Sequence, residues 1–456
     1  MRKLLLCGLP AVATLLAGAA IANPSVYPTG TTIHDPAKAW HGYVVFADPN
    51  GVTHVIDPAG NEVHRWDKAG FPSEVLDPAV AGGKKGQLLV QLENGQGRFG
   101  GIFENRVIGE LDWDGNVVWR WAGSDPDGAR QNHDWARLPN GNTLIVATRS
   151  RTIPSISTKP VADQVFQEIA PGGRVVWEWL VGDHLEEFGF SPEGLAQLRA
   201  ELANGDAGHG FLTINDLAPI GPNKWFDGGD VRFHPDNFVI DSRIGSFIAI
   251  IERATGKVVW RLGPDWPTQS SPVQRPVFSR AVPRPVDQTS GQHDAHIIAK
   301  GLPGAGNLLV FDNEGPSGFP STRLSMFHGS RILEIDPITK QVVWQYTGVD
   351  SDAPSWSFNS SFISSARRLP NGNTLIDEGM NGRIFQVTPH GEIVWEYVNP
   401  YFGRQSLGEG KDVQTNWVFR AQPVPYDWLP DGTARSEAAV AQPDNAVFRI
   451  SGVAKR

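Results

Sequence analysis

Four short segments recur at corresponding places along the chain and contain the side chains best suited to chemistry. They are His133-Asp134, Asn215-Asp216, His293-Asp294 and Ser364-Ser365, each directly before a strand-like run. The same alignment places His296 and Arg367 in register. Because the fourth segment has Ser364 in place of a histidine, the fold does not require a histidine in every copy. We therefore expect His293 and His133 to face a ligand; the alternative is that both cap turns through hydrogen bonds to the backbone.

Several arginines lie close to these segments in the sequence. Arg243 ends the run Asp241-Ser242-Arg243, and Arg323 and Arg331 follow the loop that contains Asn313. Taken singly, such residues are more often solvated at the surface. Together with the histidines, in a chain with a formal net charge of -9, they would form a local cationic site for one oxyanion. The residues predicted to contact substrate are Asn215, Asp216, Arg243, Asn313, Ser364 and Arg367.

Other kinds of site are disfavoured by the sequence. His293 and His296 are three residues apart, so on a regular strand they point to opposite faces and bind one metal ion poorly unless a bulge intervenes. No glycine-rich phosphate loop opens a helix, and no serine stands in a nucleophile-elbow pattern. The single cysteine, Cys7, lies in the amino-terminal apolar run. We predict neither a metal centre nor an organic cofactor.

A tryptophan phrase recurs along the chain and indicates how these residues are positioned. A turn is followed by two apolar residues, a tryptophan, a polar residue and then an aromatic or apolar one. The six copies centre on Trp66, Trp119, Trp177, Trp260, Trp344 and Trp395. A strand with polar-apolar alternation precedes the turn, so each copy predicts a β-hairpin. We expect the tryptophans to pack one repeat against the next; an aromatic box for substrate is the alternative.

A second phrase supplies the other two strands of a repeat. It covers residues 137–145 and again 368–376, and in both copies Asn-Gly marks a tight turn. Six units of four antiparallel strands predict an all-β fold, a six-bladed β-propeller, as one domain over residues 23–456. Ser191-Pro192-Glu193 begins a helical insertion. The segment 417–424 is expected to return a strand to the first blade and close the ring.

Composition and the amino terminus limit the class of protein. Hydrophobic residues make up 40% of the chain, with 50 glycines and 35 prolines, which fits a turn-rich β protein with a sizeable core. The negative net charge disfavours nucleic acids and anionic membrane surfaces as partners. Residues 1–22 have the pattern of a cleavable signal peptide, in which Arg2 and Lys3 precede an apolar run that ends at Ala20-Ile21-Ala22. We expect a periplasmic or secreted protein.

The chain resembles the bacterial arylsulfotransferase family in several of these segments. The matching segments are residues 291–298, 306–313, 330–334, 221–225, 232–237 and 368–376. The resemblance implies a periplasmic six-bladed propeller that moves a sulfuryl group from an aryl sulfate to a phenol without a nucleotide sulfate donor. It also implies that channel-lining histidines and an arginine perform the reaction, with one histidine transiently sulfated.

The resemblance suggests roles for individual residues of this chain. His293 matches a histidine of the family and is the first candidate for the nucleophile or base. His296 and His133 would transfer protons. The oxyanion would be stabilised by Arg323, Arg331 and Arg367. Phenols and aryl sulfates are the implied substrates.

Two departures from the family pattern leave other functions open. A histidine is expected at Thr213 and in the last blade at Ser364, and neither position has one. A propeller that binds ligands without catalysis fits these departures. A second alternative is a calcium-dependent hydrolase like the six-bladed lactonases, in which Asn215, Asp216 and Asp294 would surround the ion.

Overall fold

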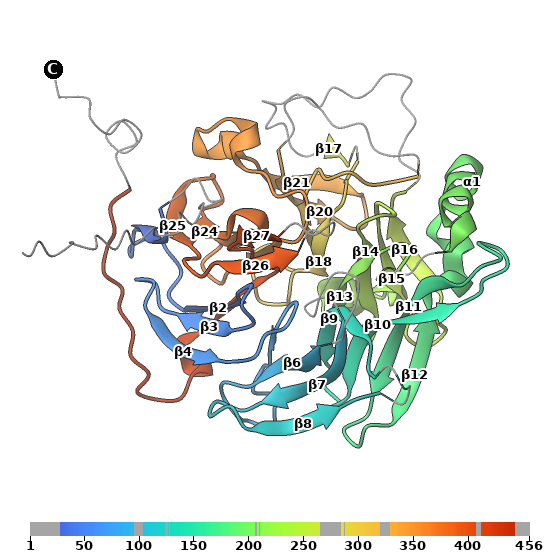
Figure 1. The fold of residues 1–456 in the computed structure, drawn as a ribbon. Coiled ribbons are helices and arrows are strands. Elements are labelled where there is room, and N and C mark those ends of the chain that lie inside the picture. Colours follow the sequence, from blue (N-terminus) through green and yellow to red (C-terminus); the bar gives the residue numbers. More distant parts are fainter. Residues whose placement is uncertain are drawn as a thin grey trace, which may run out of the picture.

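The computed structural model describes residues 28–94, 104–123, 126, 128–205, 208, 210–264, 284–286, 288–319, 329–406 and 412–442. The segment 1–22 and Arg323 lie outside these residues. The described chain is dominated by β-strands, and its sheets stand around a common centre in sequence order (Figure 1). The prediction of an all-β, propeller-like fold is confirmed.

Two of the sheets contain four antiparallel strands each. The first is ordered β28 (Ala421–Val424), β2 (Tyr43–Ala47), β3 (Thr53–Ile56) and β4 (Glu62–Trp66). The second is ordered β13 (Ile214–Pro219), β14 (Phe238–Ser242), β15 (Phe247–Ile251) and β16 (Val258–Leu262). In both, the strand that begins the order is the innermost one, since β28 and β13 both line the central cavity.

Two further sheets have a fifth strand on their outer edge, and one small sheet stands apart. The first is ordered β22 (Ser365–Arg368), β23 (Thr374–Glu378), β24 (Arg383–Val387), β25 (Ile393–Val398) and β1 (Gly30–His34). The second is ordered β18 (His293–Ile297), β19 (Leu308–Asp312), β20 (Arg331–Asp336), β21 (Gln341–Tyr346) and β17 (Arg284–Pro285). The small sheet pairs β26 (Gly403–Ser406) with β27 (Asp412–Thr415).

The remaining strands form one eight-stranded sheet, which changes the expected number of blades. Its strands are β5 (Glu74–Val75), β6 (Leu88–Asn94), β7 (Asn105–Leu111), β8 (Val117–Trp121), β9 (Gln131–Arg137), β10 (Thr143–Arg151), β11 (Val161–Ile169) and β12 (Val175–Leu180). A bridge between Asn105 and Gln131 joins β7 to β9 and merges two four-stranded meanders. Four separate blades are therefore found among the described residues, not the six that were predicted.

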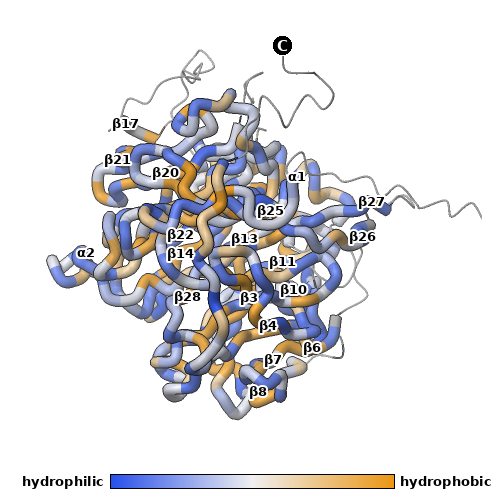
Figure 2. The backbone as a smooth tube through the Cα atoms, turned by 90° about the vertical axis from the view of Figure 1, so that its left-hand side faces the viewer, coloured by the Kyte–Doolittle hydropathy of each residue, from blue (hydrophilic) through white to orange (hydrophobic). Residues whose placement is uncertain are grey.

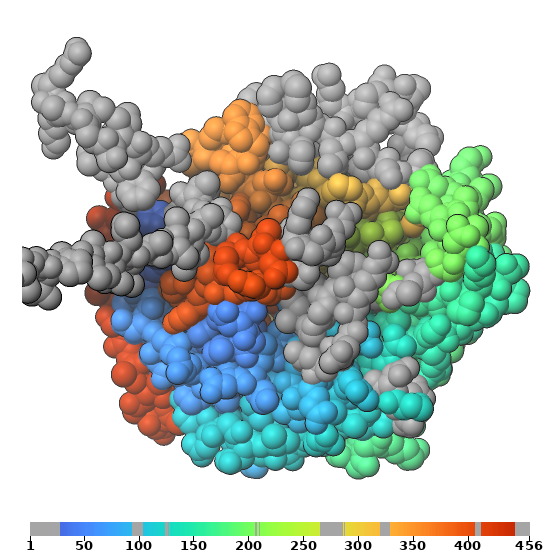
Figure 3. Space-filling model, viewed as in Figure 1, coloured from blue at the N-terminus to red at the C-terminus, as the bar shows by residue number. Residues whose placement is uncertain are grey.

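The helical insertion forms where the sequence predicts it. Helix α1 spans Pro192–Glu201, and the Ser191 hydroxyl caps it by accepting a hydrogen bond from the Gly194 N–H at 3.0 Å. It projects from the rim of the molecule (Figure 3). The other helical pieces are short: η1 (Val181–Phe188), η2 (Leu202–Asn204), α2 (Lys224–Asp227), η3 (Val231–Phe233), η4 (Gly348–Ser351), η5 (Ser355–Ser357), η6 (Gly379–Asn381) and η7 (Tyr426–Trp428).

The Asn-Gly turns connect an innermost strand to the second strand of its sheet. Between β9 and β10, the Leu138 carbonyl accepts the Gly141 N–H at 2.9 Å, and the Leu138 N–H donates to Asn142 at 2.8 Å. The left-handed backbone conformation falls on the glycine alone, with φ values of 83° at Gly141 and 92° at Gly372. Because only glycine adopts this conformation without steric cost, the turn fixes the register of the hairpin.

The two ends of the described chain close the ring. The carboxyl-terminal strand β28 pairs with β2, with Val424 opposite Tyr43, and so becomes the innermost strand of the first sheet. The amino-terminal strand β1 pairs with β25 of the last sheet. The prediction that residues 417–424 return a strand to the first blade is confirmed. Each terminal segment thus adds a strand to the sheet formed by the opposite end of the described chain.

Tryptophans link each meander to the next, as expected, but in two copies the linking residue is the second tryptophan of the phrase, Trp121 and Trp179 in place of Trp119 and Trp177. Each indole N–H donates to a backbone carbonyl in the turn between the third and fourth strands of the following meander. The six links are Trp66 to Asp112, Trp121 to Gly173, Trp179 to Gly256, Trp260 to Pro337, Trp344 to Pro389 and Trp395 to Pro58, at 2.7–3.0 Å. The last link returns to the first meander, so the series is cyclic.

Apolar cores fill the spaces between neighbouring sheets. One core joins Leu89 and Ile108 of the first half of the eight-stranded sheet to Ile145 and Val165 of the second half. These halves therefore pack face to face, although one bridge joins their strands. Figure 2 shows apolar and polar segments alternating along the chain, as expected when strands are buried and turns are solvated.

Trp260 provides a test of the links between meanders. We expect Trp260→Phe to lower the free energy of unfolding by about 1–3 kcal/mol, because the Pro337 carbonyl would lose its donor in a buried place. Trp356→Phe, at a side chain that is 54% exposed, is expected to change it by less than about 0.5 kcal/mol. Urea denaturation measures both; equal losses would show that the link to Pro337 contributes nothing specific.

Candidate functional site

Six residues occupy equivalent places on or beside the innermost strands and converge at the centre of the ring. They are Glu74, Asp134, Asp216, Asp294, Ser365 and Arg420. In five of the six copies, the N–H of the next residue bonds to a side chain of the preceding repeat, at 2.8–3.2 Å. These donors are Val75, Leu217, Ala295, Ala366 and Ala421. The equivalence shows that one repeat position carries four acids, one serine and one arginine.

Bulges in the innermost strands turn these residues toward the centre. The pairing register shifts opposite the segments around Asp134, Asn215 and Asp294. His133 and Asp294 have φ values of 56° and 60°, which non-glycine residues rarely adopt. A bulge redirects the side chains of its strand, so the alternation expected of a regular strand does not hold here.

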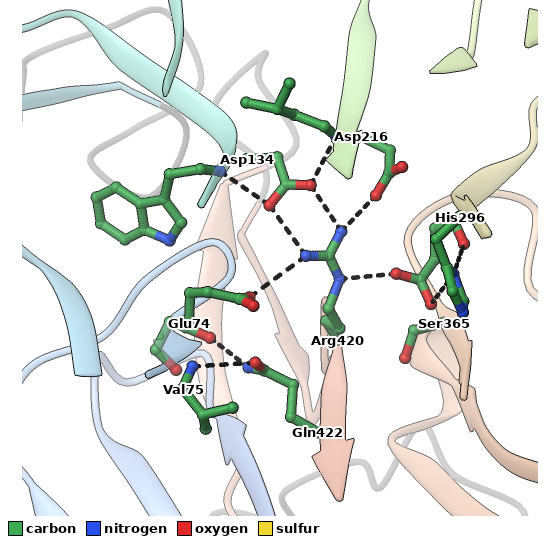
Figure 4. A network of polar contacts seen from close by, with 12 residues as sticks. Glu74, Val75, Asp134, Asp216, His296, Ser365, Arg420 and Gln422 are labelled. Carbon is green, nitrogen blue, oxygen red and sulfur yellow. Dashed lines mark hydrogen bonds and ion pairs between the residues drawn. The ribbon is translucent and has the colours of Figure 1, made fainter. Parts of the chain in front are cut away.

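The guanidinium of Arg420 binds the acids of three innermost strands at once. It donates to both carboxylate oxygens of Asp134, at 2.9 Å each, and to Asp216 at 2.8 Å (Figure 4). Its Nε lies 3.0 Å from Asp294, and its Nη1 lies 3.5 Å from Glu74. The Arg420 side chain is only 3% exposed. Such bidentate and multiple pairing is the geometry in which a buried arginine is stable.

The centre nevertheless contains more acids than bases. Burial opposes the positive charge of Arg420, but Asp134, Asp294 and Asp216 outweigh it and hold the pKa of Arg420 well above its usual value. Burial, with the neighbouring carboxylates, raises the pKa of Asp216 well above its usual range. Burial also raises the pKa of Glu74, to about 7, although Arg420 opposes this. Glu74 thus changes its protonation near neutral pH.

Two further buried acids stand behind this ring. Asp377 on β23 is fully buried, and neither of its carboxylate oxygens has a hydrogen-bond partner among the described residues. Asp241 on β14 accepts the Ala295 N–H through one oxygen, while its other oxygen is unpartnered within the described chain. Burial, then Asp294, raises the pKa of Asp377. Burial likewise raises the pKa of Asp241, because an ionised carboxylate without full hydrogen bonding is costly in such a place.

His293 lies beside the ring, but both of its ring nitrogens are engaged. Nδ1 lies 2.8 Å from the Asn313 amide oxygen and 3.0 Å from the Gly291 carbonyl, while Nε2 accepts the Ile363 N–H at 3.0 Å. Burial and the nearby Arg243 lower the pKa of His293 to about 3. His293 is therefore a neutral imidazole that ties two repeats together, which matches the turn-capping alternative.

His133 and Arg243 lie on the same side of Arg420 as His293. The Nδ1 of His133 is 2.8 Å from the Asn132 amide oxygen, and its ring lies 6.4 Å from that of Phe419. The His293 ring packs against the same phenyl group at 6.1 Å. Burial lowers the pKa of Arg243. Phe419 belongs to an apolar cluster with Phe71 and Ile363, so this part of the centre is filled by hydrocarbon.

His296 faces a cavity on the other side of Arg420. The cavity has a volume of about 470 Å³, and all six innermost strands contribute to its wall. The Nδ1 of His296 lies 2.8 Å from the Asp294 carbonyl and therefore carries the proton. No described residue bonds to Nε2. Burial and Arg367 lower the pKa of His296 to about 4, so its Nε2 is a free lone pair at neutral pH.

The cavity combines cationic and aromatic walls. Arg367 donates to Asp294 at 2.5 Å, while its buried Nε has no hydrogen-bond partner among the described residues. Arg420 and Arg367 both line the cavity, together with Trp40 and Trp135. Planar apolar groups with a few fixed cations are suited to an aromatic anion.

The other predicted residues have structural contacts. Arg331 pairs with Asp312 at 2.7 Å inside its own sheet, away from the cavity. Asn313 holds His293 and donates to Ser360 and Ile363. The Ser364 hydroxyl donates to Ser360 at 2.8 Å. Asn215 donates to the Gln292 carbonyl at 3.0 Å. Asp216 and Arg367 are the predicted contact residues that reach the cavity.

The sequence analysis missed Arg420 and Glu74. The sequence did contain a signal for them. Arg420 and Glu74 each stand directly before the repeat position that Leu217 and Ala366 occupy in other repeats. Neither lies in a tryptophan phrase or an Asn-Gly phrase, so an alignment on those phrases passes over them. The proposed calcium ligands Asp216 and Asp294 bond to Arg420 instead. The described residues include no cluster of three or more acidic, histidine or cysteine side chains arranged for a metal ion.

Comparisons with known proteins identify one matching family and one protein that is similar over a short segment. A model of the arylsulfotransferase (ASST) family matches residues 91–399. The highly reducing polyketide synthase phiA of a fungal species is 28% identical over 141 residues, which are 30% of this chain and only 5% of that protein. No helix among the described residues is long and apolar enough to cross a membrane.

Solved structures with a similar chain trace are distant in sequence. A protein of unknown function from Bacteroides caccae is 10% identical with a TM-score of 0.44, over 84% of this chain and 99% of that one. A catalytically inactive virginiamycin B lyase from Staphylococcus aureus, bound to quinupristin, is 10% identical with a TM-score of 0.37, over 85% of this chain and 96% of that one.

Arg420 provides a test of the electrostatic centre. We expect Arg420→Met to lower the free energy of unfolding at pH 8 by about 3–5 kcal/mol, because buried carboxylates would lose their counter-charge. Arg420 opposes protonation of Glu74 and Asp216, so its stabilisation is present above their pKa values and is lost as pH falls through them.

The loss caused by Arg420→Met is therefore expected to be smaller at pH 5 than at pH 8. Urea denaturation at the two pH values measures it. Arg404→Met is the matched control, because that side chain is 72% exposed and is expected to matter little at either pH. A loss of the same size at both pH values would show that Arg420 acts by packing and not by charge.

Proposed function

This chain belongs to the arylsulfotransferase family, and from that premise we propose that it transfers a sulfuryl group from an aryl sulfate donor to a phenolic acceptor. The proposal is supported chiefly by the free Nε2 of His296, which faces a cavity lined by three arginines, Arg367, Arg368 and Arg420. A neutral imidazole is a nucleophile, and the positive charge of fixed guanidinium groups attracts the oxygens of a sulfate ester. These two elements are what sulfuryl transfer requires.

His296 is proposed as the nucleophile in place of His293. Attack on sulfur needs an unshared lone pair, and the Nε2 of His293 already accepts the Ile363 N–H. In His296, the proton on Nδ1 is held by the Asp294 carbonyl, which leaves Nε2 as the nucleophilic atom. When Nε2 bonds to sulfur the ring becomes cationic, and the Asp294 carboxylate, 4.0 Å from Nδ1, stabilises that charge.

The arginines are proposed to stabilise charge on the sulfuryl oxygens. Arg367 and Arg420 are held by carboxylates and need no rearrangement when the sulfuryl group moves. The aromatic walls Trp40 and Trp135 provide apolar contact for the aryl ring of the donor and then of the acceptor. A volume of about 470 Å³ lies in the usual range for a small-molecule site.

We propose further that the scaffold is a single six-bladed propeller. Six meanders, six indole links that form a cycle and face-to-face packing between the halves of the eight-stranded sheet support this count. Under this proposal the bridge between Asn105 and Gln131 is a local contact between two blades. A six-fold ring is also the arrangement in which the six equivalent central residues meet.

Replacement of His296 tests the proposed chemistry. We expect His296→Ala to reduce transfer from p-nitrophenyl sulfate to phenol by roughly 10³-fold or more, because it removes the atom that bonds to sulfur. Release of p-nitrophenol measures the rate. With donor alone, intact-protein mass spectrometry is expected to detect one added sulfuryl group on the unmodified protein and none on His296→Ala.

His390→Ala is the matched control, because His390 lies exposed in the turn between β24 and β25. It is expected to retain both the rate and the sulfuryl adduct. An adduct that persists in His296→Ala would place the nucleophile elsewhere. Tight binding of aryl sulfate without any turnover by the unmodified protein would favour a ligand-binding propeller instead.

We propose that residues 1–22, which lie outside the described structure, direct export of the protein. Residues 1–22 have the pattern of a cleaved signal peptide, and a periplasmic or secreted protein would meet exogenous phenols directly. Amino-terminal sequencing of the protein recovered from the periplasm or medium of an expressing bacterium is expected to begin at Asn23. Retention of Met1 in a cytoplasmic product would contradict export.

A further inference from the structure

Glu74 differs from the other acids at the centre in what it contacts. Asp134 bonds to two nitrogens of Arg420 and to the backbone N–H groups of Trp135 and Leu217. Among the described residues, no donor makes a hydrogen bond to Glu74, and its buried Oε2 lies 3.5 Å from Arg420. The strand register therefore holds Glu74 beside the guanidinium, while its carboxylate oxygens accept no hydrogen bond from the described residues.

Glu74 is also accessible from the cavity. It lines the cavity wall, and 23% of its side chain is exposed, although it lies deep in the ring. Figure 4 shows Glu74 and His296 on opposite sides of the Arg420 guanidinium. A substrate whose sulfur approaches His296 would therefore extend past Arg420 in the direction of Glu74, because both residues line the same cavity.

We propose that Glu74 is the proton donor and acceptor of the transfer reaction, an inference that rests on the proposed function. In the first half-reaction, the bond from sulfur to the aryl oxygen breaks and the bond from sulfur to His296 Nε2 forms. The leaving phenolate takes the proton of the Glu74 carboxylic acid. In the second half-reaction, the acceptor phenol gives its proton to the Glu74 carboxylate, its oxygen bonds to sulfur, and the bond to Nε2 breaks.

The charges around Glu74 suit this alternation. Arg420 and Arg367 favour the carboxylate, while Asp134 and Asp294 favour the acid, and burial shifts the balance so that the pKa is raised to about 7. A phenol has a pKa of about 10, so a group near 7 protonates a phenolate readily and still accepts a proton in part at neutral pH. Asp134 and Asp294 are held by hydrogen bonds to arginines, and Asp216, which also lines the cavity, is bonded to Arg420 through one oxygen.

Glu74→Gln separates this role from a structural one through the leaving group. Phenyl sulfate releases a basic phenolate that needs a proton, whereas p-nitrophenyl sulfate releases a weakly basic one. We expect kcat/KM of Glu74→Gln to fall by roughly 10²–10⁴-fold for phenyl sulfate but by less than about tenfold for p-nitrophenyl sulfate. Glu93→Gln, an exposed glutamate on β6, is the matched control and is expected to change neither value.

The pH dependence gives a second readout with opposite signs for the two substrates. For the unmodified protein, kcat/KM for phenyl sulfate is expected to fall as pH rises through about 7, because the acid form is needed. The value for the acceptor phenol is expected to fall as pH falls through the same range, because the carboxylate is needed. Both dependences are expected to persist in Glu74→Asp and to vanish in Glu74→Gln.

The outcomes distinguish failure of this inference from failure of the proposed function. Equal losses for both donors in Glu74→Gln, or unchanged pH profiles, would overturn the role of Glu74 while leaving sulfuryl transfer intact. Absence of transfer from either donor by the unmodified protein would overturn the proposed function itself. Thermal unfolding of each variant identifies loss of structure, and Glu74→Asp, which keeps the carboxyl group, tests the role if Glu74→Gln fails to fold.

Discussion

The structure depends on the neutralisation of converging acids by one buried guanidinium. A repeat that places a polar residue at the same position of every innermost strand brings those residues together at the centre. Because Asp134, Asp216 and Asp294 point inward, the ring would be repulsive without a cation, and Arg420 supplies it from the same position of another repeat. Arg420 stands directly before β28, the strand that closes the ring. The pairing of β28 with β2 therefore also brings the cation to the centre.

This arrangement makes the two sides of the centre chemically different. On the side of Phe419, His133 and His293 meet hydrocarbon and their nitrogens are used in hydrogen bonds. On the side of His296, a cavity is lined by polar side chains that include three arginines. The repeat thus supplies histidines in similar sequence contexts, and the bulges decide which of them keeps a free lone pair.

The sequence predicted the architecture better than the chemistry. Tryptophan phrases and Asn-Gly turns act locally, so they correctly indicated the hairpins, the links between repeats and the closing strand. The assignment of His293 as nucleophile was based on its place in the repeat and on the family resemblance, whereas its engagement by Asn313 and Ile363 depends on contacts between residues distant in the sequence. Arg420 escaped because its role comes from the position of three other strands, which no local pattern records. The merged sheet was missed because a single bridge has no sequence signature.

Departure from strict repetition makes the contacts of the central acids unequal. A fully acidic ring would hold a cation symmetrically, and each acid would have the same contacts. Here Ser365 replaces one acid and Arg420 another, so the guanidinium lies off the symmetric position and reaches Asp134 closely but Glu74 only at 3.5 Å. Burial raises the pKa of Glu74 to about 7, while Asp134 and Asp294 are held by hydrogen bonds to arginines. Both Glu74 and Arg420 lie outside residues 91–399, so the strands that complete the ring, and not the matched region alone, define the chemistry of the cavity.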